Sequence, residues 1–337
     1  MDRPRRRPLL LIIAALAAGP SGAQTLRAQR WLAPGADAST ILSRRPVECL
    51  PTPGRAAPGE AYLIEVGRAA FRDPLLLGGQ AARAGVACET CHSNGRTNRD
   101  FAFPGVSGAP GTADVTSFVF SSHRGDRLAD PRPIPDLGGP KAALKVSQAP
   151  DSPALRAFIR GLVTEEFDGH PPPDAVLDGL AAYVRALQPA DCDLEAVEPV
   201  TVVAAFADVD RAVAAAREAL ALGDRETASA MIRSARGALG DIAERFAGPR
   251  LSNARADVTR ASRALGEVLP DDREAPASAL RRLDAWTRHF SRWRSAVVRA
   301  EPFSLYEPRR LAAALALSRS VAVTPPRAAP SARAGGG

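Results

Sequence analysis

Five consecutive residues, Cys88-Glu89-Thr90-Cys91-His92, constrain this chain more than any other segment. A CxxCH sequence in an exported chain is the attachment site for c-type haem, in which two thiols bond the porphyrin and the histidine binds the iron. The same cysteine pair could serve a zinc site or a redox dithiol. A zinc site requires a second Cys/His pair at ligand spacing and a thioredoxin-like motif requires a βαβ context, and the sequence offers neither. It therefore predicts one covalent haem c held by Cys88, Cys91 and His92.

The first 23 residues have the pattern of a secretory signal peptide. A cluster of arginines precedes an apolar run from Leu9 to Ala18, and Ser21-Gly22-Ala23 follows as a small-residue cleavage site. The run is too short for a stable membrane anchor, although an uncleaved anchor is the alternative, and no later stretch is long and apolar enough to span a bilayer. We therefore expect a periplasmic protein, in a compartment where haem c is attached and disulfides persist.

The charge balance argues against a nucleic-acid partner. The formal net charge of the 337 residues is +7, and removing residues 1–23 takes away four arginines and Asp2 and leaves +4. The basic residues are interspersed with Asp and Glu, which is typical of solvated helix faces. The length allows two domains.

The hydrophobic pattern predicts an all-α protein, with a cytochrome c-like haem domain over residues 45–192. Apolar residues at helical spacing predict helices over 60–72, 152–162 and 174–187. The first and last of these helices cross closely in cytochromes c, and Gly67 permits such an approach, with Phe71 and Tyr183 beside it. The Gly/Pro-rich stretch 93–150 is expected to wrap the far side of the porphyrin without regular elements.

Residues 193–320 are predicted to form an up-and-down helical bundle. Helices are expected over 200–222, 225–246, 251–269 and 277–299, with a shorter one over 308–320, separated by Gly, Pro and Asp breakers. No ligand cluster or nucleophile is evident there, and Trp286 and Trp293 are expected in the core. Residues 321–337, rich in Pro, Ala and Gly, are expected to be a disordered tail.

The two cysteines outside the motif, Cys49 and Cys192, lie on either side of the predicted haem domain. In an oxidising compartment they are candidates for a disulfide that closes the domain at its ends, which the chain-entropy model values at about 4 kcal/mol. The alternative is two separate buried thiols.

The stretch from Gly67 to Pro74, followed by Leu76-Leu77 and the CxxCH motif, resembles the N-terminal haem domain of the bacterial dihaem cytochrome c peroxidase and MauG-type family. Residues 172–187 resemble the closing helix of such domains. The resemblance covers only the first predicted domain. Family members carry two CxxCH motifs, whereas this chain has one and no cysteine after Cys192. The two-haem chemistry of the family is therefore not implied within this polypeptide.

The ligand at the sixth coordination position of the iron distinguishes between the possible functions. Met1 leaves with the signal peptide and Met231 lies in the other predicted domain, so methionine ligation is not expected. His123, in the loop region over the distal face, is the first candidate, followed by an open or water-bound position and by His170. His289 belongs to the C-terminal helices.

Two classes of function follow, and a third remains open. Ligation by two histidines suits a cytochrome that transfers electrons to or from a periplasmic or membrane-associated partner protein. An open position suits a single-haem peroxidase or oxidase-like enzyme, for which His123 and Arg124 could supply the distal groups. It also suits a haem-based sensor of a small ligand. Arg96, Arg99 and Arg124 are expected either to pair with haem propionates or to face solvent.

Overall fold

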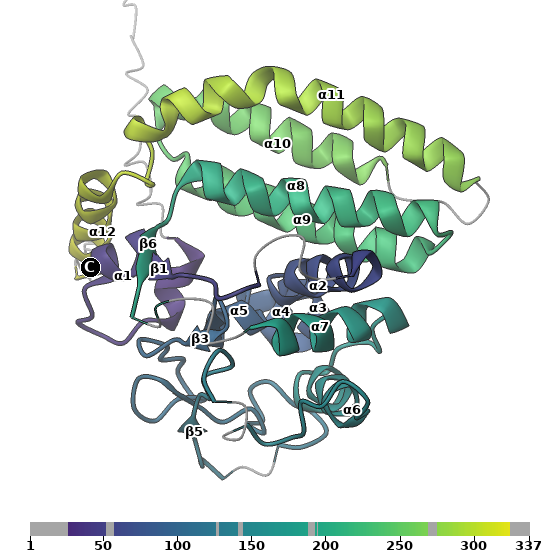
Figure 1. Ribbon diagram of the computed structural model, residues 1–337. Coiled ribbons are helices and arrows are strands. Elements are labelled where there is room, and N and C mark those ends of the chain that lie inside the picture. The colour runs from purple at the N-terminus through teal and green to yellow at the C-terminus, as the bar shows by residue number, and fades with distance from the viewer. Residues whose placement is uncertain are drawn as a thin grey trace, which may run out of the picture.

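The computed structural model describes residues 26–51, 57–125, 128–140, 144–187, 193, 195–268 and 275–323. Helices dominate these residues and the strands are two or three residues long, which confirms the predicted all-α class (Figure 1). The predicted signal peptide lies outside the described residues, as do residues 324–337 of the predicted tail.

Two crossed helices, α2 (Pro58–Phe71) and α7 (Asp174–Ala186), form the centre of the first predicted domain. Pro58 is pre-organised for the first turn of α2, and Asp73-Pro74 follows its end. The helices meet at Gly67, where a Cβ atom would lie 1.9 Å from the backbone oxygen of Gly179. The predicted close crossing at Gly67 is therefore confirmed.

Short elements connect these two helices. Residues 74–91 are mostly helical. In the described part of the stretch 93–150 the structure has two-residue strands and no helix, where the Gly/Pro content predicts no regular elements. The connecting elements are α3 (Pro74–Leu77), α4 (Gly79–Ala84), α5 (Cys88–Cys91), β2 (His92–Ser93), β3 (Arg96–Thr97), β4 (Thr112–Ala113), β5 (Arg132–Pro133), α6 (Ala154–Gly161) and the π-helix η3 (Leu162–Glu166). β2 pairs with β3 and β4 with β5, both antiparallel.

The second half of the chain forms the predicted up-and-down bundle. Its helices are α8 (Val202–Ala221), α9 (Arg225–Arg245), α10 (Ser252–Gly266) and α11 (Pro276–Ala300). Each helix packs on the next, and α11 packs back on α8, which closes the bundle. Thr201 and Asp224 cap α8 and α9 by accepting backbone N–H bonds. Trp286 is buried, and its Nε1 donates to Ala261 O at 3.0 Å.

The two predicted domains share one continuous hydrophobic core. Residues of α2 and α7 belong to the same buried cluster as those of the bundle, and α2 packs on α8 and α9. Ser234 of α9 donates its hydroxyl to Ala69 O of α2 at 2.7 Å. The antiparallel strands β1 (Arg44–Pro46) and β6 (Val197–Pro199) add a second connection. The result is three helical layers, with α8 and α9 between the α2–α7 pair and the outer helices α10 and α11 (Figure 1).

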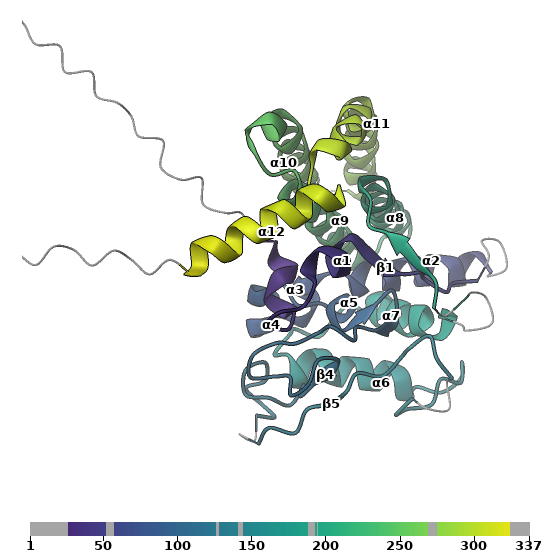
Figure 2. The same cartoon turned by 90° about the vertical axis from the view of Figure 1, so that its left-hand side faces the viewer.

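The N-terminal described segment packs on the last helix. Leu26 and Leu42 are buried with Leu305, Leu311 and Leu315 in a small separate cluster. Figure 2 shows α12 passing over α1. The elements of this region are η1 (Arg27–Trp31), α1 (Ala38–Ser43), η6 (Glu301–Phe303) and α12 (Pro308–Val323). Leu251 of η5 (Pro249–Leu251) is buried in the main core. None of the helices in the described part of the chain is both long enough and apolar enough to cross a membrane.

Candidate functional site

The CxxCH motif forms one helical turn, α5, which is hydrogen-bonded to the chain on both sides. The backbone N–H of Ala87 donates to Thr90 Oγ1 at 3.0 Å. At the other end, Asn98 Nδ2 donates to Thr90 O at 2.8 Å and the backbone N–H of Asn98 donates to Cys91 O at 2.9 Å. A single turn lacks most intrahelical hydrogen bonds, so these contacts define its geometry.

Cys88 and Cys91 are both free thiols with partial exposure. Both pack against a buried apolar cluster outside the bundle, and Cys88 also packs against the main core. Burial raises the pKa of each thiol to about 12, so both are protonated at neutral pH. The cluster consists of Leu77, Ala81, Val86, Phe101, Val106, Phe120, Ile134, Val163 and Phe167. The two thiols therefore lie beside apolar surface and form no disulfide bond.

His92, directly after the turn, has a defined tautomer. Its Nδ1 lies 3.0 Å from Pro135 O. Because a carbonyl oxygen only accepts, Nδ1 carries the proton and Nε2 keeps its lone pair. Burial lowers the pKa of His92 to about 4, so the ring is neutral at physiological pH. A neutral imidazole whose other nitrogen donates to a carbonyl is the usual form of a metal-binding histidine.

Asn94 completes the reversal of the chain behind His92. It has a φ of 48°, in the left-handed region that Asn tolerates better than most residues, and it is only 1% exposed. Its Oδ1 accepts from Arg72 Nη2 at 2.7 Å and its Nδ2 donates to Pro46 O at 2.8 Å. Its backbone N–H donates to Glu89 Oε1 at 2.9 Å. Asn94 thus links the motif to α2 and to the N-terminal segment.

A buried charge network supports the turn from the side of α2. Glu48 accepts from Arg72 Nη2 at 2.9 Å and from Tyr183 Oη at 2.7 Å, and it also pairs with Arg68. Burial by itself raises the pKa of Glu48, but Arg72 and Arg68 outweigh it and lower the pKa to about 2. Phe71 joins this region to the haem motif, because its ring centroid lies 5.1 Å from that of Tyr183 and 6.3 Å from that of His92. The predicted position of Phe71 and Tyr183 beside the helix crossing is confirmed.

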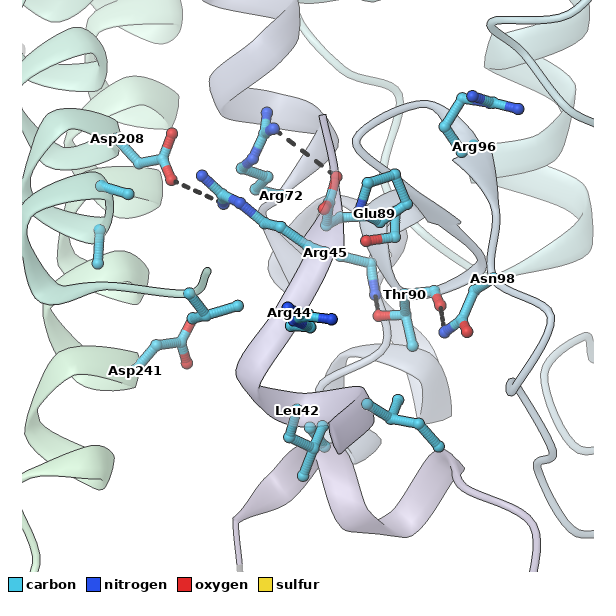
Figure 3. Close-up of a pocket in the computed structure, with 18 of the residues that line it drawn as sticks. Leu42, Arg44, Arg45, Arg72, Glu89, Thr90, Arg96, Asn98, Asp208 and Asp241 are labelled. Atoms are coloured by element: carbon cyan, nitrogen blue, oxygen red, sulfur yellow. Dashed lines mark hydrogen bonds and ion pairs between the residues drawn. The ribbon is translucent and has the colours of Figure 1, made fainter. Parts of the chain in front are cut away.

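A pocket of about 740 Å³ lies behind the turn, between the N-terminal segment, α2 and the bundle. Figure 3 shows Arg45 reaching across it toward Asp208 of α8, with Glu89 and Thr90 on the other side. The Arg45 Nη1 to Asp208 Oδ2 distance is 3.8 Å, as is that from Arg72 Nη2 to Glu89 Oε2. Cys88, Cys91 and His92 are not among its lining residues. The pocket therefore separates the back of the motif from the bundle and does not receive its thiols.

The three other histidines are all exposed. The His123 side chain is 64% exposed, and its Nε2 lies 3.8 Å from Asp168 Oδ1. The contacts of His123 are thus with the segment after η3 and not with the CxxCH turn. His170 and His289 lie elsewhere on the surface, and Met231 is fully buried in α9. His123 as sixth ligand stays a prediction.

Two of the three arginines predicted near haem propionates have carboxylate partners. Arg96 donates to both carboxylate oxygens of Asp136, at 2.8–2.9 Å from its Nε. Arg124 pairs with Glu165 and lies 3.5 Å from Glu166 Oε1. Arg99 is exposed. The sequence did not predict the partners of Arg96 and Arg124, because they lie about forty residues away in the chain.

Cys49 is 1% exposed and takes part in a disulfide bond. Its predicted partner, Cys192, lies outside the described residues, so the Cys49–Cys192 pairing stays a prediction.

Among the residues that the structure describes, no group of three or more His, Cys, Asp or Glu side chains could hold a metal ion. Comparisons with known protein families, with curated proteins and with solved structures find no match to this chain. The resemblance to the dihaem peroxidase family therefore depends on its motif residues alone.

Proposed function

We propose that the protein is an exported c-type cytochrome that carries one covalent haem and transfers electrons to or from a partner protein. The observation that carries this proposal is the state of three side chains on the turn α5 and the residue that follows it. Cys88 and Cys91 are free thiols, and His92 is neutral with Nδ1 bound to Pro135 O. This donor set fits haem c, since each side chain is in the form that the attachment requires.

The roles of the residues follow from this fit. Cys88 and Cys91 would hold the porphyrin, and His92 would give its Nε2 lone pair to the iron. When bound, the haem supplies reversible one-electron chemistry. The apolar cluster beside the two thiols would exclude water from the porphyrin, and the Pro135 carbonyl would keep the imidazole oriented and raise its basicity.

Two observations favour electron transfer over a peroxidase. The chain has one CxxCH motif, so it lacks the second haem that stores an electron in the family it resembles. Arg124, the arginine predicted to assist peroxide cleavage, pairs with Glu165. That pairing neutralises the positive charge with which a distal arginine polarises an O–O bond.

The proposed partner is a periplasmic or membrane-associated redox protein. This follows from the signal-peptide pattern of residues 1–23 and from the need of a one-electron carrier for a donor and an acceptor.

Absorption and EPR spectra of the purified haem-loaded protein test the proposed function. They are recorded in the ferric and ferrous states, with and without cyanide or carbon monoxide. We expect a low-spin ferric haem that resists added ligands. A high-spin haem that binds them readily, together with peroxide turnover, would contradict electron transfer and favour the enzyme.

A further inference from the structure

The outer helices α10 and α11 carry a concentrated positive charge. Together they contain nine arginines and only two acidic residues, Asp257 and Asp284. Their net charge therefore equals the +7 of the whole chain, so the rest of the chain is close to neutral. The overall composition hides this asymmetry, which appears only when charge is counted element by element.

Four of these arginines form one line along α11. Arg281, Arg288, Arg292 and Arg299 are all exposed. Arg288, Arg292 and Arg299 stand seven, eleven and eighteen residues after Arg281, which at about 100° per residue places each of them within roughly 20° of Arg281 around the helix axis. At 1.5 Å per residue, the line is about 27 Å long. We call these four residues the arginine line.

Among the described residues, no carboxylate forms an ion pair with the arginine line. Arg288, Arg292 and Arg299 have no ion pair with any described residue, and Arg281 donates only to Ser278 Oγ, at 3.0 Å. The two acidic residues of these helices are occupied, because Asp284 pairs with Arg217 and Asp257 with Arg260.

Arg294 shows the contrast within the same helix. Its guanidinium pairs with Asp210 of α8, at 2.5 Å, and lies 4.9 Å from the ring centroid of Phe206. Arg294 therefore stabilises the packing of α11 on α8. The arginine line faces the other way and has no such structural role. Arg288 and Arg292 stand four residues apart on the same face of the helix, and the repulsion between their like charges destabilises the helix slightly.

The surface around the arginine line lacks the features of a specific protein interface. Such interfaces bury a few large apolar or aromatic anchors at their centre. None of the large hydrophobic side chains exposed in the described part of the chain belongs to α10 or α11. Small residues, Ala285, Ser295 and Ala296, lie between the arginines. A long line of unpaired positive charge without apolar anchors fits a flat array of anionic groups.

We propose that the arginine line docks the protein on the surface of a bilayer containing anionic phospholipids. The apolar face of α11 is occupied by the bundle core, so the helix lies on the headgroups and does not insert. The layers place the haem motif away from the membrane, because α8 and α9 separate α11 from α2 and α7 (Figure 1). The proposal depends on the outer layer alone and is independent of the proposed function.

Co-sedimentation with lipid vesicles tests this docking. The probe is a vesicle of phosphatidylcholine containing about one third phosphatidylglycerol, compared with pure phosphatidylcholine, at low salt and at about 1 M salt, where exposed charges are screened. We expect the purified protein to bind the anionic vesicles at low salt only. Each arginine near such a surface strengthens binding roughly fivefold.

The decisive variant is R281Q/R288Q/R292Q/R299Q. Its binding should fall several hundred-fold, by about fivefold for each of four arginines. The matched control, R30Q/R83Q/R132Q/R160Q, removes four exposed arginines from other faces and should bind within about threefold of the parent. The conservative variant with four lysines at the line should retain binding, and circular dichroism checks that each variant is helical.

Three outcomes would overturn the proposal. The first is equal loss of binding in the line variant and the control, which would mean that only net charge matters. The second is equal binding of the parent protein to neutral vesicles. The third is tighter binding to polyglutamate or to duplex DNA than to anionic vesicles at the same charge concentration.

Discussion

Gly67 and Gly179 bring the backbones of α2 and α7 together so closely that a methyl group at Gly67 would lie 1.9 Å from Gly179 O. The obstacle is backbone, so no side-chain rearrangement can relieve it. The two helices carry Phe71 and Tyr183, through which the crossing reaches His92. Phe71 of α2 therefore connects this crossing to the proposed haem ligand.

We predict that Gly67→Ala destabilises the protein by at least 1–3 kcal/mol, the usual cost of overpacking a core. Urea unfolding measures this loss of unfolding free energy. The control is Gly237→Ala in α9, where an added Cβ meets nothing within 4 Å. In a helix interior that change should stabilise by up to about 1 kcal/mol. Equal stabilities of the two variants would show that α2 and α7 are not in contact at Gly67.

Glu48→Gln is predicted to cost about 3 kcal/mol of unfolding free energy. The Glu48 side chain is only 8% exposed and pairs with Arg68 and Arg72. Its loss leaves two largely buried guanidinium groups with only the more distant Glu65 and Glu89 carboxylates, at 3.6 and 3.8 Å. The control is Asp174→Asn, which removes an 86%-exposed carboxylate that pairs with Arg156. Because exposed ion pairs contribute little, this control should lie within about 1 kcal/mol of the parent. A Glu48→Gln variant as stable as the Asp174→Asn variant would exclude a buried network.

The same carboxylate predicts a pH dependence. The pKa of Glu48 falls from 4.5 to about 2 on folding, so its stabilising contribution is fully present above pH 4.5 and disappears as the pH falls toward 2. The stability difference between the parent and Glu48→Gln should therefore be constant above pH 5 and shrink between pH 4.5 and about 2. Urea midpoints of both proteins across this range measure it. A stability difference between the two proteins that grows on acidification would contradict a lowered pKa of Glu48 in the folded state.

His123→Ala tests the predicted sixth ligand. We expect the ferric haem to change from low spin to high spin in this variant and to become accessible to cyanide, with EPR as the measurement. His289→Ala, an exposed histidine on α11, is the control and should leave the spectrum unchanged. A low-spin signal that persists in His123→Ala would assign the position to another group, and His170→Ala would be the next variant.

The regular parts of the fold were predictable from the sequence. The expected helix over 174–187 is observed over Asp174–Ala186, and that over 225–246 is observed over Arg225–Arg245. Periodicity, caps and breakers are local signals, so they identify long amphipathic helices well. The crossing at Gly67 was also predictable, because few residues allow two helix backbones to approach so closely.

The connections between distant segments were not predictable. Glu48 lies 135 residues before Tyr183, and Pro135 lies 43 residues after His92. Neither pair has a local sequence signal, because both depend on tertiary folding of irregular chain. The packing of Leu26 and Leu42 on α12 was missed for a similar reason, since α1 is too short to show a helical period. The shared core of the two halves follows from the same long-range packing.

The most direct test of the account is whether haem stays bound to the unfolded chain. The protein is expressed with the haem-attachment machinery, denatured and extracted with acid and organic solvent, and its intact mass is measured beside that of Cys88→Ala/Cys91→Ala. We predict that the parent retains one haem and that the double variant releases it. A parent chain that emerges without haem, or a double variant that keeps it, would contradict covalent attachment at Cys88 and Cys91.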